Sequence, residues 1–180
     1  LLVLILVTGS GYGGSPFSNA ESTFMGILYV GVLASFAFQV RSASFDGVTA
    51  NETAFFAILI LVSIWISDIA GYFAGRAFGR RHPFPDISPG KTVAGFVGGI
   101  LASVGLILFA STQFEFLTVW HGVGLGLVVG LGAPIGDLVE SMIKRDAGVK
   151  DASTIIPGHG GILDRFDSFL FVFPLVYVYL

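Results

Sequence analysis

Long apolar runs separated by short polar breaks constrain the fold of this 180-residue chain more than any other feature. A helix needs about 20 mainly apolar residues to cross a bilayer, whereas a barrel strand needs about 9 to 11. Because lipid offers no hydrogen bonds to the backbone, runs of the longer kind favour helices. The runs are residues 1–7, 24–40, 53–75, 92–112, 120–139 and 162–180. The sequence therefore predicts an all-α fold, a polytopic transmembrane helical bundle with about five to six spans.

The composition agrees with a membrane environment and excludes several classes of function. Hydrophobic residues make up 54% of the chain and charged residues 12%, against roughly 25% charged residues in soluble domains. With a formal charge of -3 and no large basic patch, the chain is not expected to bind nucleic acid. The absence of cysteine excludes disulfides, a thiol nucleophile and cysteine-ligated zinc.

The first residue, Leu1, lies within an apolar run, and neither an initiator methionine nor basic residues precede it. This start is interpreted as a cut through a hydrophobic segment and not as a secretory signal. We expect residues 1–180 to form a single transmembrane domain, the C-terminal part of a longer chain.

The distribution of lysine and arginine predicts the orientation of the bundle, because consecutive spans place alternate loops on opposite faces. One set of loops holds seven of these residues and the other holds Arg41 alone. By the positive-inside rule the basic loops are cytoplasmic and Leu180 is on the far side. The basic loops are residues 8–23, 76–91 and 140–161, and the opposite loops are residues 41–52 and 113–119.

Four acidic residues, Asp68, Asp137, Asp164 and Asp167, lie within or at the ends of the predicted spans. An ionisable group inside a bilayer is costly and indicates a functional site. The alternative is a helix end that reaches water, which has most weight for Asp164 and Asp167 because they follow a polar loop. All four lie toward the basic face, so we expect them to line one cavity that faces the cytoplasm.

Helical spacing adds a hydroxyl and a cation to these acids, since residues three and four apart share a face. Asp137, Ser141 and Lys144 form such a stripe. Carboxylates from two helices beside lysines and arginines suit Mg²⁺ holding a polyphosphate. The alternative is a proton or ion relay through Asp68 and Asp137 in a transporter, which does not require the cluster of basic residues.

Two glycine-containing loops, "GHGG" and "SPGKT", precede predicted helix starts, where anions are favoured. Their backbone N–H groups and side chains are candidates for contacts with phosphate oxygens. The alternative for the first is a glycine-rich turn after Pro157, and for the second a turn with a snorkelling lysine. The candidates are His159, Gly160 and Gly161 in the first loop and Ser88, Lys91 and Thr92 in the second.

The stretch "SMIKRDAGVKDASTIIPGHGGILDRFD", residues 141–167, resembles the signature of phosphatidate cytidylyltransferases, also called CDP-diacylglycerol synthases. The match has no gap, and the segments "SDIAGYFAGRAFGRR" and "ISPGKT" are similar to the family as well. The resemblance covers most of residues 60–180, which we expect to be the catalytic region. The chain departs from the family at Val93 and Ala94, where an aromatic residue and a glutamate are usual. This departure leaves room for a different substrate preference or for impaired activity.

The resemblance implies conversion of CTP and phosphatidate into CDP-diacylglycerol and pyrophosphate at the cytoplasmic face of a membrane. It implies an integral protein of a bacterial cytoplasmic (inner) membrane that depends on Mg²⁺. K⁺ is a candidate second cation, and a homodimer is a candidate assembly. The rival functions are a cytidylyltransferase for another lipid phosphate, such as an isoprenoid type, an ion-coupled transporter, and a catalytically silent paralogue.

The roles expected of individual residues combine this resemblance with the charge pattern. Asp137 and Asp164 are expected to bind the metal as catalytic residues, with Asp167 as a third ligand or as a partner of Arg165. Lys144 and Arg165 are expected to hold the phosphates of CTP or of the transition state. The substrate-binding candidates are Asp68, which is also the candidate ligand of the second cation, Ser88, Lys91, Thr92, Arg145, Lys150, Asp151, His159, Gly160, Gly161 and Asp167.

Overall fold

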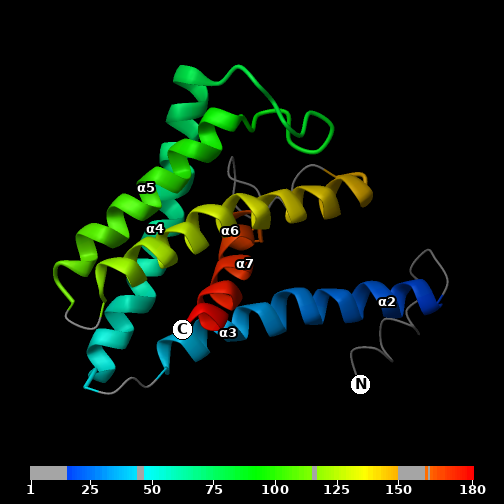
Figure 1. Ribbon diagram of the computed structural model, residues 1–180. Helices are drawn as coiled ribbons and strands as arrows, with labels where there is room; N and C mark the ends of the chain where they lie inside the picture. The colour runs from blue at the N-terminus through cyan, green and yellow to red at the C-terminus, as the bar shows by residue number, and fades with distance from the viewer. Residues whose placement is uncertain (1–15, 44–46, 115–116, 150–160, 162) are drawn as a thin grey trace.

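A computed structural model of the chain describes residues 16–43, 47–114, 117–149, 161 and 163–180. Within these residues the regular secondary structure is entirely helical, and α2, a π-helical segment η1 and α3 follow one another without a break (Figure 1). The elements are α2 (Pro16–Gly26), η1 (Ile27–Val32), α3 (Leu33–Arg41), α4 (Ala50–Phe78), α5 (Val93–Ser111), α6 (Val119–Asp146) and α7 (Leu163–Tyr179).

The predicted all-α transmembrane bundle is confirmed, because every predicted run from residue 24 onward coincides with a helix. By length and composition, four helical segments of the described chain are able to cross a membrane. The helix α7 has 17 residues and packs along α6. The predicted run at residues 1–7 lies outside the described residues. The four segments are Thr23–Arg41, Ala50–Phe78, Val93–Ser111 and Val119–Asp146.

A threonine immediately before each of α4, α5 and α6 explains where these helices begin. The hydroxyl of Thr92 accepts a hydrogen bond from the backbone N–H of Gly95 at 3.1 Å, and Thr118 accepts one from His121 at 3.3 Å. Thr49 forms a capping box with Glu52. Such caps satisfy N–H groups that have no partner in the first turn of a helix. The expected helix start near Thr92 is therefore confirmed.

Glycines allow α4, α5 and α6 to approach one another closely. A Cβ atom on Gly95 would lie 2.8 Å from the carbonyl oxygen of Gly71, at the contact between α5 and α4. A Cβ atom on Gly126 would lie 2.5 Å from Cα of Val104, at the contact between α6 and α5. In lipid, the association of helices depends on such close packing, because the surrounding acyl chains are as apolar as the side chains and the hydrophobic effect does not drive helices together.

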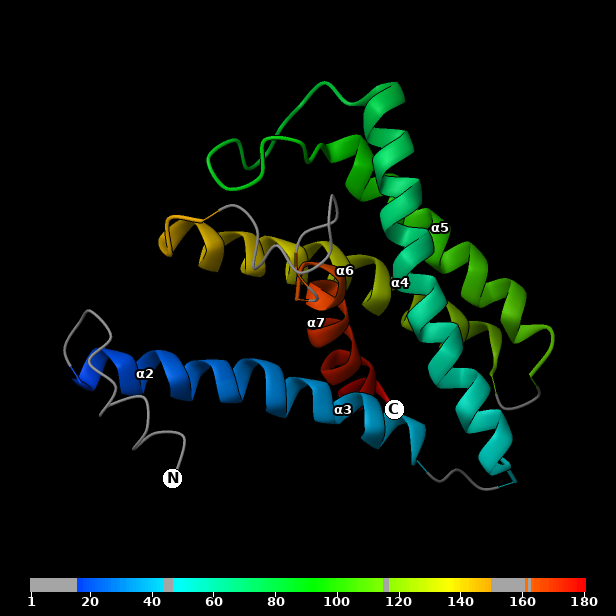
Figure 2. The same cartoon turned by 180° about the vertical axis from the view of Figure 1, so that it is seen from behind.

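The helix α7 lies between α6 and α3 in both views of the ribbon (Figure 2). Its C-terminal half contributes to an apolar core that joins the first half of α4, the middle of α6 and the end of α3. Its N-terminal half carries the acidic residues toward α6. The bundle is therefore apolar in one half and polar in the other. The core residues are Val40, Phe56, Ile60, Ile64, Ile107, Leu117, Leu125, Val129, Ala133, Val172, Phe173 and Val176.

Candidate functional site

A cavity of about 660 Å³ opens in the polar half of the bundle. Its walls come from the second half of α4, the connection from Gly79 to Thr92, the first turns of α5, the second half of α6 and the first turns of α7. Segments that are far apart in the sequence thus contribute charged groups to one space. The titratable residues of its lining are Asp68, Tyr72, Arg76, His82, Lys91, Asp137, Lys144, Asp164 and Asp167.

Asp137 is held between a cation and a hydroxyl. The ammonium of Lys91 lies 2.8 Å from its Oδ2 atom, and the hydroxyl of Ser141 donates to its Oδ1 atom at 3.3 Å. The Lys91 ammonium also donates to the backbone carbonyl of Pro134 at 2.9 Å. Helical spacing correctly predicted the contact with Ser141 on the same face, whereas the ion pair joins residues 46 positions apart in the chain.

A second lysine links α6 to α7. The ammonium of Lys144 lies 2.5 Å from Oε2 of Glu140 and donates to Oδ1 of Asp164 at 2.6 Å. The other oxygen of Asp164 accepts from the backbone N–H of Gly161 at 2.6 Å. Lys144 therefore fixes the start of α7 against α6 in the wall of the cavity.

Glu140 is a residue of this cluster that the sequence reasoning missed. Its side chain is about 1% exposed, and neither of its oxygens accepts a hydrogen bond of normal geometry within the described residues, although Lys144 is close. One oxygen each of Asp137, Glu140 and Asp167 lie within 4.8 Å of one another. The signal was present in the sequence, because Glu140 follows Asp137 by three residues and precedes Lys144 by four.

The donor set of this cluster fits a hard divalent cation. Carboxylate oxygens are the ligands that Mg²⁺ prefers, usually together with water and substrate phosphates. A carboxylate that is buried without a full set of partners is costly and calls for a cation or proton. The carboxylates around the cavity also outnumber its lysines and arginine, so the site has negative charge left to neutralise. The carboxylates are those of Asp68, Asp137, Glu140, Asp164 and Asp167, and the cations are those of Arg76, Lys91 and Lys144.

Most of the predicted site residues within the described chain meet at this cavity. Asp68 is on α4, where its exposed side chain contributes to the lining. Thr92 also lines the cavity, and its hydroxyl caps α5. Asp164 pairs with Lys144 and is not one of the three carboxylates of the cluster. The predicted residues in the lining are Asp68, Lys91, Thr92, Asp137, Lys144, Asp164 and Asp167.

Other predicted residues lie away from the lining. Ser88 is partly buried in the connection before α5 and is absent from the cavity wall. Arg145 is exposed and donates to the carbonyl of Val149 at 3.3 Å, and Arg165 is exposed on α7. Gly161 is buried and contacts Asp164 through its N–H group. The predictions for Lys150, Asp151, His159 and Gly160 fall outside the described residues.

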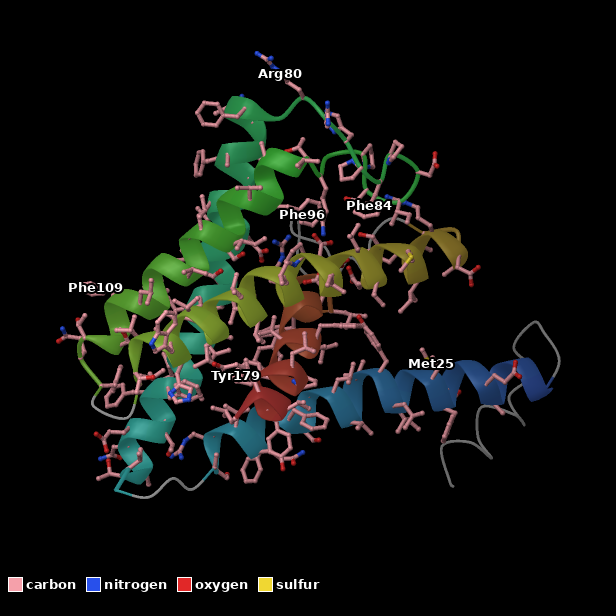
Figure 3. The ribbon with its side chains drawn as sticks, viewed as in Figure 1. Met25, Arg80, Phe84, Phe96, Phe109 and Tyr179 are labelled. Atoms are coloured by element: carbon pink, nitrogen blue, oxygen red, sulfur yellow. The ribbon has the colours of Figure 1, made fainter. Side chains whose placement is uncertain are left out.

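Aromatic and basic side chains contribute to the cavity wall, among them Tyr72, Arg76, Lys91 and Phe96. Arg76 donates to the hydroxyl of Tyr72 at 3.0 Å, one turn apart on α4. The rings of Phe84 and Phe96 meet edge to face at 6.2 Å between centroids, and both are labelled in Figure 3. Phe96 also lies 5.9 Å from the Lys91 ammonium, measured to the ring centroid. This part of the wall therefore combines apolar surface with positive charge beside the acidic cluster.

Comparisons with known proteins agree with the resemblance seen in the sequence. The model of the cytidylyltransferase family matches residues 1–180. A phosphatidate cytidylyltransferase of Staphylococcus aureus is 40% identical over 166 residues, which cover 91% of this chain and 60% of the relative. A phosphatidate cytidylyltransferase of Staphylococcus epidermidis is 39% identical over 165 residues, with the same coverage. The chain thus spans about 60% of the length of these curated relatives.

Proposed function

The chain belongs to the cytidylyltransferase family, and from this premise we propose that it is the catalytic part of a phosphatidate cytidylyltransferase. The reaction would convert CTP and phosphatidate into CDP-diacylglycerol and pyrophosphate. One observation carries the proposal. A cavity between helices long enough to span a membrane joins carboxylates of α4, α6 and α7 with a lysine just before α5 and a lysine of α6. The names of the relatives support the same choice of substrates.

The proposed chemistry is an in-line displacement at the α-phosphorus of CTP. A phosphate oxygen of the lipid forms the new P–O bond, and the bond to the bridging oxygen of the β-phosphate breaks, so that pyrophosphate leaves. A phosphate monoester is already anionic at neutral pH. The site therefore needs alignment and neutralisation of charge more than a strong base.

The carboxylates proposed from the sequence to hold Mg²⁺ are Asp137, Asp164 and Asp167. Glu140 is added to them because one of its oxygens lies within 4.8 Å of oxygens of Asp137 and Asp167. A bound Mg²⁺ would supply positive charge to the phosphates that develop negative charge during the transfer. Asp68 faces the same cavity from α4 and is the proposed ligand of a second cation, K⁺.

The basic residues would hold the triphosphate beside the carboxylates, with which both lysines are in contact. Lys144 and Arg165 are the proposed partners of the CTP phosphates, and Lys91, in the connection just before α5, is a further one. Groups of the loops and of the adjoining ends of α6 and α7 would shape the nucleotide pocket. These groups are Ser88, Thr92, Arg145, Lys150, Asp151, His159, Gly160, Gly161 and Asp167.

Membrane placement supports a lipid substrate. A cavity between spanning helices would let a lipid headgroup reach the carboxylates while its acyl chains stay in the bilayer. The excess of lysine and arginine in the loops on one face supports a site that faces the cytoplasm. We propose the inner membrane of a bacterium, in agreement with the bacterial relatives, and a homodimer as the assembly.

The test is an assay with the full-length protein, labelled CTP, phosphatidate and Mg²⁺. We expect labelled CDP-lipid to form and to require each component. Replacing phosphatidate by an isoprenoid phosphate tests the sibling activity, and a preference for that lipid would change the substrate. Binding of CTP without turnover under all conditions would contradict an enzymatic role and would favour the silent paralogue.

A further inference from the structure

The ion pair between Lys91 and Asp137 raises a question about metal binding. Both oxygens of Asp137 are already engaged, one by the Lys91 ammonium at 2.8 Å and the other by the hydroxyl of Ser141 at 3.3 Å. A cation that binds Asp137 must therefore share or replace a contact. The stronger of the two contacts is charge-assisted, and its donor is itself a cation.

The position of Lys91 is built by the fold. Its side chain is about 17% exposed, and its ammonium donates to the carbonyl of Pro134, one turn before Asp137 on α6. Residues 91 and 137 come from different elements, so this contact needs the tertiary packing of α5 against α6. The ammonium thus occupies a defined place beside the acidic cluster.

We propose that the Lys91 ammonium neutralises Asp137 while no divalent cation is bound. When the metal binds Asp137, the Lys91 side chain moves, and its ammonium then contacts the phosphates of the nucleotide. This inference rests on the proposed function, because it needs a metal and a polyphosphate at the same cavity. It makes Lys91 a positioning residue that couples the two binding events.

Electrostatics gives the direction of the transfer. A divalent ion at Asp137 and an ammonium within a few ångströms of it repel each other strongly in a partly buried site. The lysine side chain is long and flexible, so the ammonium can leave while the backbone of residue 91 stays in place. The ring of Phe96 already lies 5.9 Å from the ammonium, measured to its centroid, within reach of a cation–π interaction. A triphosphate in the cavity then provides the new anionic partner.

Two consequences of opposite sign distinguish this role from a structural one. Removing the ammonium frees Asp137, so the metal alone should bind more tightly. Removing it also deletes a phosphate partner, so CTP should bind more weakly when the metal is saturating. A residue that only maintained the shape of the site would weaken both.

The experiment measures binding of Mn²⁺ alone, by electron paramagnetic resonance, to the full-length protein in detergent. Lys91→Met and Lys91→Gln should each bind Mn²⁺ about tenfold more tightly than the wild type, and Lys91→Arg should not. The matched control is Arg80→Met, which removes a charge from the same connection; Figure 3 shows Arg80 pointing away from the bundle. This control should leave Mn²⁺ affinity within about twofold, since an exposed charge is screened.

Unchanged or weaker Mn²⁺ binding in Lys91→Met and Lys91→Gln would overturn the proposal. If these variants do not fold, a measurement on the wild type still tests the proposal. Mn²⁺ should increase labelling of Lys91 by an amine-reactive reagent, detected by peptide mass spectrometry, and unchanged or decreased labelling would contradict the transfer. Failure of the proposed function is recognised separately, because it appears as absence of CDP-lipid formation by the wild type.

Discussion

The apolar half and the polar half of the bundle are built from the same helices, but one half packs a core and the other lines a cavity. On α4, the first half buries Phe56 and Ile60 in the apolar core, whereas the second half presents Asp68 and Arg76 to the cavity. On α7 the order is reversed along the chain, with the acidic residues before the apolar ones. A helix that is fixed at its apolar end can carry charged groups at its other end without a separate scaffold.

Because one half is an apolar core and the other lines a polar cavity, substitutions in the two halves should affect different properties of the protein. Apolar packing should determine how stable the bundle is, and the polar half should determine what it binds. Substitutions in the polar half should therefore change ligand affinity and turnover with little change in stability, and substitutions in the apolar half should do the reverse.

The largest effect is expected from Asp137→Asn. The amide keeps the shape of the side chain but removes the charge that would bind a metal, so CDP-lipid formation should fall by about a thousandfold. Thermal unfolding in detergent should change little, because the residue is outside the apolar core. Turnover close to that of the wild type would remove Asp137 from the site.

Glu140→Gln should reduce Mn²⁺ affinity by about 10- to 100-fold, because the carboxylate is buried in the cluster with Asp137 and Asp167. Titration with Mn²⁺ alone measures the effect. Glu52→Gln is the matched control, since Glu52 belongs to the capping box at the start of α4 and not to the acidic cluster. Equal Mn²⁺ affinities in the two variants would show that Glu140 is only a partner of Lys144.

The sequence predicts contacts between residues close together in the chain, but not contacts that depend on how distant segments pack. Hydropathy predicted the spans, because a helix in lipid satisfies its own backbone, and spacing placed Ser141 beside Asp137. The contact of Lys91 with Asp137 could not be predicted, since it depends on how α5 packs on α6. The charge of Glu140 was visible in the sequence, but its burial was not.

Gly136→Ala tests whether the close contact between α6 and α7 positions the acids. The added methyl group would lie 2.9 Å from Cα of Ser168 and from the carbonyl oxygen of Asp167, so α7 must move away. We expect Mn²⁺ affinity to fall by about tenfold. Gly105→Ala is the control, because a Cβ atom there meets nothing within 4 Å. A similar loss in both variants would point to a general effect of alanine on the helices.

The smallest effect on the site is expected from Ile60→Ala, in the apolar half. Ile60 is fully buried, and its truncation should lower the free energy of unfolding by about 2 kcal/mol through the cavity that it leaves. The turnover number of the protein that remains folded should stay within about twofold of the wild type. A large loss of turnover at unchanged stability would mean that the two halves are not separable.

Pulsed electron paramagnetic resonance on the full-length protein with Mn²⁺ and CTP tests the central claim most directly, namely that the carboxylates of α6 and α7 hold a metal together with a nucleotide. We predict phosphorus hyperfine coupling to protein-bound Mn²⁺ in the wild type and loss of that bound species in Asp137→Asn. The same bound Mn²⁺ signal in both proteins, or bound Mn²⁺ without phosphorus coupling, would contradict the account.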